Sequence, residues 1–304
     1  MPAAVAIDHV TKTYGSHVAV RDLSLQVPEN SIYGFIGPNG SGKTTTLRMI
    51  MRILHPNTGE IRVLGDDSWS SANDRVGYLP EERGLYKQMK VRELLRFYAA
   101  LKSYRVSRQE IDSWLERMGL IDWGEKRIEA LSKGMAQKVQ FIATVIARPE
   151  LVLLDEPFSG LDPVNGEVLR EAVLDLKRRG ATVLFSTHDM ATAERMCDFI
   201  CMIYQGNKVL DGTLESIQDS YGSDTLRVRL DGEGVDFARL PGVLKVTDHG
   251  RFQELRLDRE TDTQGLLARL MTQGKVRHFE LARPSLQDIF VRIASPETEE
   301  KNHA

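Results

Sequence analysis

The chain has 304 residues, of which 41% are hydrophobic and 27% charged, and its net charge is −3. These values are typical of a soluble globular protein with one large domain or two ordinary ones. The slightly negative charge argues against nucleic acid or an anionic membrane surface as the main partner.

Two cysteines, Cys197 and Cys201, lie four residues apart. Without a second pair they support neither a disulfide framework nor a zinc site, and we expect both in the core. The sequence contains no signal-peptide pattern at its N-terminus and no run of about 18 apolar residues that would span a membrane. We therefore expect a cytoplasmic protein, which needs another chain for any membrane span.

The N-terminal residues 5–30 are expected to form short strands joined by turns. Tyr14 stands directly before a Gly15-Ser16 turn. An aromatic ring at this place can stack on a purine base, because every base has a π-face. The alternative is a tyrosine that packs at the edge of a sheet.

The phosphate-binding loop pattern G-x-x-x-x-G-K-[ST] is matched at every fixed position by Gly37-Pro38-Asn39-Gly40-Ser41-Gly42-Lys43-Thr44. A short apolar strand precedes it, and a helix opens at Thr44 and Thr45, which disfavours a simple glycine-rich turn. The glycines allow successive N–H groups to face one concave space at a helix N-terminus, where anions bind. We expect Lys43 to reach the β- and γ-phosphates and the Thr44 hydroxyl to bind Mg²⁺.

A helical subdomain is predicted at about residues 88–150, where the hydrophobic period changes to 3.6. Ser107 and Glu110 form a capping-box pattern at the start of one of its helices. The apolar stripes of this region are assigned to the core.

Two acids follow the next strand. Residues 151–154 are four consecutive aliphatics, typical of a parallel strand buried on both faces, and Asp155 and Glu156 come directly after them. Ligands bind at the carboxyl ends of strands in open parallel sheets, so these acids indicate a site. A second buried strand, 182–187, ends at His188, which we place at the same edge.

The C-terminal part is predicted to be separate. Residues 212–224 are polar and rich in turn residues and are expected to be a linker, so the first domain is placed at 1–220. Residues 221–294 have the pattern of a small α+β domain without a catalytic cluster, and the tail 295–304 is expected to be disordered.

The order of these motifs resembles that of the ATP-binding-cassette (ABC) ATPases over about residues 5–220. It comprises the phosphate loop, a helical insertion, Leu131-Ser132-Lys133-Gly134-Met135-Ala136-Gln137, the Asp155-Glu156 strand, Ser159-Gly160-Leu161-Asp162 and His188. Residues 77–86 and 284–290 further resemble the sodium-extrusion type of ABC exporter ATPase. The resemblance implies an α/β fold, a P-loop NTPase cassette with a RecA-like core, an antiparallel β subdomain and a helical subdomain, followed by the small C-terminal domain.

The resemblance also implies roles. Asp155 would hold Mg²⁺, Glu156 would be the general base, His188 would contact the γ-phosphate, and Tyr14 would stack on adenine. Two subunits, either two copies or one copy and a homologue, would pair head to tail. Ser132 and Gly134 of one would then close on the ATP bound by the other, with Asp162 at the seam. The dimer would drive an integral membrane permease from the inner face of the cell membrane.

Two positions depart from the family pattern. Glu81 stands where glutamine is usual, at a position that senses Mg²⁺ and the attacking water, and a carboxylate there is still a good Mg²⁺ ligand. Lys133 and Met135 replace a glycine and a glutamine. Two alternatives stay open: a soluble ABC ATPase that acts on nucleic acid or ribosomes, and a regulatory module without turnover. The chain has neither the coiled-coil insertion nor the second cassette that a soluble ABC ATPase of this kind would have. The presence of Glu156 and His188 disfavours a regulatory module without turnover.

Overall fold

The computed structural model describes residues 2–65, 74–82, 84–222, 225–231, 235–258 and 260–294. The chain divides into two compact units, Met1–Thr213 and Leu214–Ala304. The predicted disordered tail, 295–304, lies outside the described residues, as does position 83 of the 77–86 motif.

The first sheet of unit 1 has three antiparallel strands. Its order is β2-β1-β4, with β1 at Ala3–Tyr14, β2 at His17–Pro28 and β4 at Thr58–Val63. Apolar side chains of β1 and β2 are buried on one face, among them Val5, Ile7 and Leu25, as period-two alternation requires. The N-terminal strands predicted from the sequence are thus confirmed.

The central sheet of unit 1 has the order β5-β6-β7-β3-β8-β9. Its strands are β3 (Ile32–Ile36), β5 (Val76–Leu79), β6 (Leu151–Asp155), β7 (Thr182–Thr187), β8 (Phe199–Tyr204) and β9 (Asn207–Gly212). All neighbours pair in parallel except β8 and β9. Every residue of β3, β6 and β7 is buried, so their apolar runs are covered on both faces. The carboxyl ends of these three strands meet at one edge.

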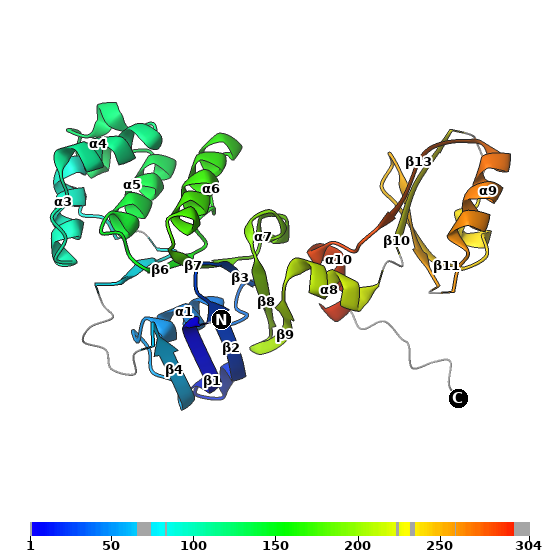
Figure 1. Cartoon of the computed structure of the whole chain (residues 1–304), viewed down its shortest axis with the longest axis horizontal. Helices are drawn as coiled ribbons and strands as arrows, with labels where there is room; N and C mark the ends of the chain where they lie inside the picture. The colour runs from blue at the N-terminus through cyan, green and yellow to red at the C-terminus, as the bar shows by residue number, and fades with distance from the viewer. Residues whose placement is uncertain are drawn as a thin grey trace. The chain divides into compact units, whose positions relative to one another are not determined.

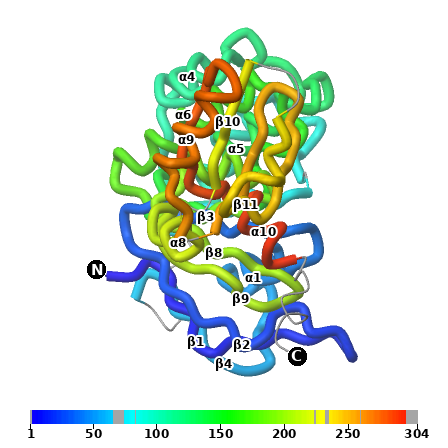
Figure 2. The backbone as a smooth tube through the Cα atoms, turned by 90° about the vertical axis from the view of Figure 1, so that its right-hand side faces the viewer, coloured from blue at the N-terminus to red at the C-terminus, as the bar shows by residue number. Residues whose placement is uncertain are grey.

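The helices of unit 1 are α1 (Lys43–Ile50), α3 (Val91–Leu101), α4 (Arg108–Arg117), α5 (Lys133–Val145), α6 (Pro163–Arg178) and α7 (Met190–Met196). Figure 1 and Figure 2 show α4 at the end of unit 1 opposite the three-stranded sheet. The expected capping box at α4 is present, because Ser107 and Glu110 exchange hydrogen bonds. Cys201 is buried and Cys197 partly buried, and both are free thiols.

Unit 2 contains an antiparallel sheet of order β11-β12-β10-β13, and its described residues also form α-helices. The strands are β10 (Thr225–Asp231), β11 (Val243–Asp248), β12 (Gln253–Leu257) and β13 (Lys275–Ala282); the helices are α8 (Leu214–Tyr221), α9 (Thr263–Gln273) and α10 (Leu286–Ala294). Its core includes Leu226, Leu255 and Leu270. Helix α8 forms where the sequence predicted a linker. Leu214, Ile217 and Tyr221 stand at helical spacing in this helix, but its 8 residues are too few for the period to repeat clearly.

Candidate active site

The loop between β3 and α1 requires glycine at two positions. Gly37 and Gly42 have φ angles of 151° and 109°. A Cβ atom would lie 2.1 Å from the Ile203 carbonyl oxygen at Gly37, and 2.4 Å from the Ala19 carbonyl oxygen at Gly42. No other residue type fits such contacts with the backbone. The loop leads directly into the N-terminus of α1, where unpaired N–H groups and the helix dipole favour an anion.

Lys43 folds across this loop. Its side chain is only 6% exposed and donates to the carbonyl oxygens of Gly37 (2.7 Å) and Pro38 (3.1 Å). Its Nζ atom lies 3.8 Å from Oε1 of Glu156. Burial lowers the pKa of Lys43, while the charges of Glu156, Asp155 and Glu81 oppose this shift. The lysine and the acids therefore share one electrostatic environment, as expected for groups that surround a charged substrate.

Asp155 ends β6 with one oxygen bound and one without a partner. Its Oδ1 atom accepts hydrogen bonds from Thr44 Oγ1 (3.1 Å) and Ser186 Oγ (2.6 Å). Its Oδ2 atom is buried and has no hydrogen-bond partner among the residues described. A buried unpaired carboxylate oxygen beside a threonine hydroxyl is a donor set that suits a hard cation.

Glu156 is held in an unusual backbone conformation. Its φ angle is 50°, in the left-handed region, and its N–H donates to the side-chain oxygen of Ser186 (3.1 Å). Its Oε1 atom lies 2.9 Å from Nδ1 of His188. Such strain persists only where surrounding contacts fix it, and it is frequent at functional sites. Neighbouring strands β6 and β7 therefore bring both acids and the histidine together.

Ser186 links these acids, and the sequence analysis missed it. It is fully buried in β7, and the register of the parallel strands pairs it with Asp155. Its hydroxyl donates to Asp155 and accepts from Glu156. A serine within an otherwise apolar strand, next to the strand that carries the acids, was the available signal.

A cavity of about 160 Å³ adjoins the acids. It is lined by Leu79, Pro80, Glu81, Lys133, Gln137, Gln140, Asp155, Glu156 and Ser159. Glu81 is thus brought near both acids. Within the described ranges, however, no group of three or more His, Cys, Asp or Glu side chains is arranged to hold a metal ion. Glu81 does not complete such a cluster here.

The remaining expected site residues lie apart from this group. Ser132 is the exposed N-cap of α5, and Asp162 is the exposed N-cap of α6, where its carboxylate accepts from two backbone N–H groups. Gly134 follows Ser132 in the first turn of α5, and a Cβ atom there would lie 3.4 Å from Leu161. Tyr14, at the end of β1, is 48% exposed and has the Lys12 ammonium 5.4 Å from its ring centroid.

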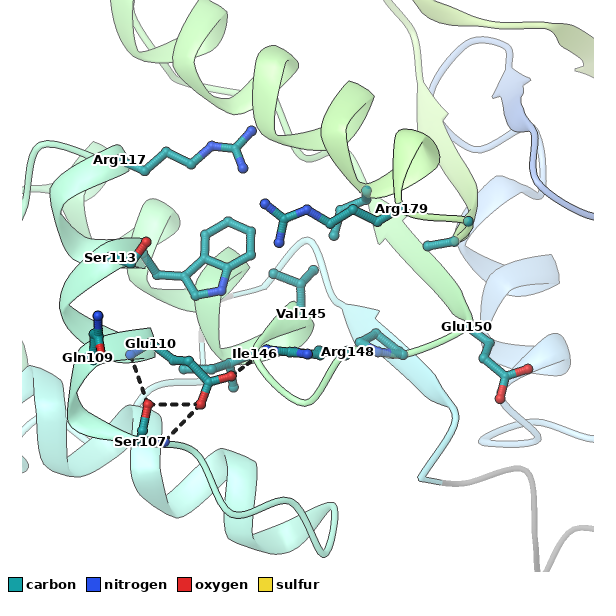
Figure 3. Close-up of a pocket in the computed structure, with 15 residues that line it drawn as sticks. Ser107, Gln109, Glu110, Ser113, Arg117, Val145, Ile146, Arg148, Glu150 and Arg179 are labelled. Carbon is teal, nitrogen blue, oxygen red and sulfur yellow. Dashed lines mark hydrogen bonds and ion pairs between the residues drawn. The ribbon is translucent and has the colours of Figure 1, made fainter.

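A larger pocket, of about 710 Å³, lies between α4 and the C-terminal ends of α5 and α6. Figure 3 shows Arg117 and Arg179 pointing into it from opposite sides. Both arginines bind Asp175, and Arg148 binds Glu110 at 2.6 Å. Each of the three arginines thus already has a carboxylate partner, and we assign no phosphate site to this pocket.

The fold and the loop geometry define a nucleotide-binding protein of the P-loop class. The family profile described as "ABC transporter" matches residues 20–159, and that of the "ATP-binding protein DrrA1-3-like, C-terminal domain" matches residues 212–294. A solved structure described as "Structure of ATP binding subunit of ABC transporter" is 31% identical, with a TM-score of 0.66, and covers 72% of this chain and 93% of that one.

Two curated relatives extend over almost the whole chain. The uncharacterized ABC transporter ATP-binding protein YhaQ of Bacillus subtilis (strain 168) is 43% identical over 94% of this chain and 97% of its own length. The Nod factor export ATP-binding protein I of Rhizobium leguminosarum bv. viciae is 31% identical over 98% and 97%. The chain therefore belongs to the family of ABC transporter ATP-binding proteins.

Membership confirms the ABC cassette fold and the function class predicted from the sequence. The chain is an ATP-binding subunit with ATPase activity coupled to transport, and the family implies membrane partner components and dimerisation. In the part of the chain that the structure describes, no helix has the length and apolar character that crossing a membrane requires.

Proposed function

We propose that this chain powers export through a separately encoded permease, and that it hydrolyses ATP at the edge of β3, β6 and β7. The observation that carries the proposal is the contact network Thr44–Asp155–Ser186–Glu156–His188, with Lys43 3.8 Å from Glu156. The loop of residues 37–45 binds the phosphates of ATP through backbone N–H groups, which Pro38 lacks, and through the Lys43 ammonium. Tyr14 stacks on adenine.

Mg²⁺ fits the donors at this site. Thr44 and Asp155 are the residues that hold it, because the free Oδ2 of Asp155 is a buried oxygen ligand without another partner among the described residues. Two protein oxygens suffice, because Mg²⁺ usually completes its octahedron with substrate phosphates and waters. When bound, Mg²⁺ would neutralise charge on the triphosphate. Glu81 lines the adjoining cavity and contributes a carboxylate at its rim.

Glu156 is the general base of the hydrolysis. The contact with Ser186 fixes its backbone and the contact with His188 fixes its carboxylate, so it accepts the proton of an attacking water with little reorganisation. His188 is 53% exposed, so its ring reaches the open side of the site, and there it contacts the γ-phosphate. Lys43 supplies fixed positive charge for the triphosphate.

The partner surface of the dimer is formed by the exposed N-termini of α5 and α6. Ser132, Gly134 and Asp162 are placed there with no described contact to Lys43 or Thr44, which supports action on the ATP of a second copy or a homologous subunit. Helix N-termini attract the γ-phosphate of that ATP, so ATP closes the dimer and its hydrolysis opens it.

The relatives support export and a site of action at the membrane. One aligned over nearly the full length is named for Nod factor export, so we assign this chain to the same direction of transport. It works on the cytoplasmic side, bound to the inner face of the membrane through its permease. No role on nucleic acid is assigned.

The decisive test is steady-state ATPase activity of the purified chain beside Glu156→Gln, measured over a range of protein concentrations with and without Mg²⁺. We expect Mg²⁺-dependent turnover whose specific rate rises with concentration. Loss of the base lowers kcat by ~10²–10⁴-fold and leaves ATP affinity unchanged. Unchanged hydrolysis by Glu156→Gln would overturn the assignment of the base.

Glu150→Gln is the matched control. Glu150 directly precedes β6, at the strand's opposite end, and pairs with Arg75 at the surface. Its removal leaves kcat within about twofold. If the wild-type chain binds ATP without turnover, Glu81→Gln separates two causes: recovered hydrolysis identifies the extra carboxylate as inhibitory, and continued inactivity indicates that the permease is required.

A further inference from the structure

Lys138 of α5 is a buried cation that the hydrolysis mechanism does not use. It lies one and a half turns after Ser132, and its residue is 6% exposed. Its Nζ atom donates to the carbonyl oxygen of Met118 (2.7 Å) and to Oδ1 of Asn165 (2.7 Å). Among the described residues it makes no ion pair. A buried ammonium with only neutral acceptors is costly, so its two partners matter to the fold around it.

These two partners belong to different helices. Met118 is the C-cap of α4, where a cation satisfies the last carbonyl groups and the helix dipole. Asn165 lies in the first turn of α6, three residues after its N-cap Asp162. Lys138 therefore joins α5 to the end of α4 and to the start of α6. The motif at the N-terminus of α5, residues 131–137, is called the signature loop below.

The lysine also determines how the Asn165 amide is oriented. An ammonium only donates, so the amide oxygen must face Lys138, and the Nδ2 group then points to Oδ2 of Asp162. The Oδ1 atom of Asp162 meanwhile accepts from the backbone N–H groups of Val164 and Asn165, both at 3.0 Å. The backbone of α6 therefore holds Oδ1 of Asp162, and the Asn165 amide that Lys138 orients holds Oδ2.

We infer that Lys138 is a positioning residue for the dimer surface: through Asn165 it sets the orientation of the Asp162 carboxylate relative to Ser132 and Gly134. The inference rests on the proposed function, in which these three residues face a second subunit. Lys138 and Ser132 lie on the same helix, so one rigid element holds the signature loop at its N-terminus and controls Asp162 through its middle. The signature loop and Asp162 are thus already aligned before the partner binds, which lowers the entropy lost on association.

The experiment measures ATP-dependent self-association of the full chain by sedimentation velocity in the Glu156→Gln background, where ATP persists. Lys138→Met keeps the apolar stem and removes the donors. We expect it to raise the midpoint concentration for association about tenfold, the size of one lost hydrogen bond to a charged group. ATP affinity of the dilute, monomeric chain stays within twofold. Asn165→Ala, at a partly buried surface position, shifts the midpoint in the same direction.

Lys102→Met is the matched control. Lys102 also lies in the helical subdomain, is partly buried, and donates to a backbone carbonyl, that of Val76 (3.1 Å), but it does not reach α6. It should leave the association midpoint within twofold. The double variant Lys138→Met/Asn165→Ala should associate as tightly as the single variant with the larger midpoint shift, because both changes break the same chain of contacts.

Three results overturn the inference. The first is an equal shift of the association midpoint in Lys138→Met and Lys102→Met. The others are a midpoint shift in the double variant equal to the product of the two single shifts, and a loss of ATP affinity by the monomeric Lys138→Met chain. If Lys138→Met does not fold, Asn165→Ala decides alone, and an unshifted midpoint rejects the inference. A Glu156→Gln chain without further changes that binds ATP but stays monomeric at every concentration rejects the pairing of two copies of this chain, and with it the inference. Normal wild-type association with unaltered variants rejects only the role of Lys138.

Discussion

The expected site residues form two groups that differ in how the chain holds them. The inner group, Lys43, Thr44, Asp155, Glu156 and His188, is joined by hydrogen bonds and a lysine–carboxylate contact at one edge of the central sheet. The outer group consists of Ser132, Gly134 and Asp162, at the first turns of α5 and α6. The residues of the inner group contact one another within a single chain. The residues of the outer group lie at the exposed ends of two helices.

This difference separates two steps of the cycle. The inner group has its own partners, so we expect a single chain to bind ATP. The outer group gains its partner only in a dimer, so we expect it to control association and turnover without affecting binding by the monomer. The following variants test this division, from the largest expected effect to the smallest.

Gly42→Ala should abolish the inner group's function. The new Cβ atom would lie 2.4 Å from the Ala19 carbonyl oxygen, on a backbone with φ of 109°, so the loop must deform. We expect ATP affinity to fall by more than about 100-fold, because several N–H donors lose their alignment. Isothermal titration with ATP measures this directly.

Gly166→Ala is its control. Gly166 lies in α6 with open space around it and should tolerate alanine with a gain of about 0.5–1 kcal/mol in stability. Wild-type ATP affinity in Gly42→Ala would show that ATP binds elsewhere than in this loop.

Ser132→Asp should separate the outer group from the inner one. Aspartate is as good an N-cap as serine, so α5 stays capped, but a negative charge now faces the partner's triphosphate. We expect monomer ATP affinity within about twofold and turnover lowered by at least about tenfold. Concentration-dependent ATPase assays and titration of the dilute chain give both values.

Ser107→Asp provides the comparison, since Ser107 is also an N-cap, that of α4, and takes no part in either group. Its turnover should match the wild type. Equal losses in the two serine variants would assign the Ser132 effect to capping and remove the outer group's proposed role.

Glu110→Gln should have the smallest effect, on stability alone. The Ser107 backbone N–H and the Tyr104 hydroxyl lower the pKa of Glu110 to about 2, from an ordinary value of 4.5. A lowered native pKa stabilises the fold above pH 4.5, and this contribution is lost as the pH falls towards 2. The variant should melt about 2 °C below wild type at pH 7, with the gap closing towards pH 2. A gap independent of pH would show that the carboxylate charge is not its cause.

The sequence predicted the inner group well because local rules govern it. A glycine pattern between a strand and a helix specifies the anion-binding loop, and an aliphatic run before two acids specifies a buried parallel strand with polar side chains at its end. The strands of the central sheet and most helices follow from the same hydrophobic periods. Helices α7 and α8 are exceptions, since with 7 and 8 residues they are too short for the helical period to repeat clearly.

By itself, then, the sequence determined the elements, the phosphate loop and the acids, since each depends on neighbours within about ten residues. Only the tertiary structure decided which distant side chains meet. Ser186 bridges Asp155 and Glu156 because β6 and β7 pair in a particular register. Lys138 reaches Asn165 because α5 packs beside α6. Such contacts depend on strand register and helix packing across long sequence separations, and no local pattern encodes them.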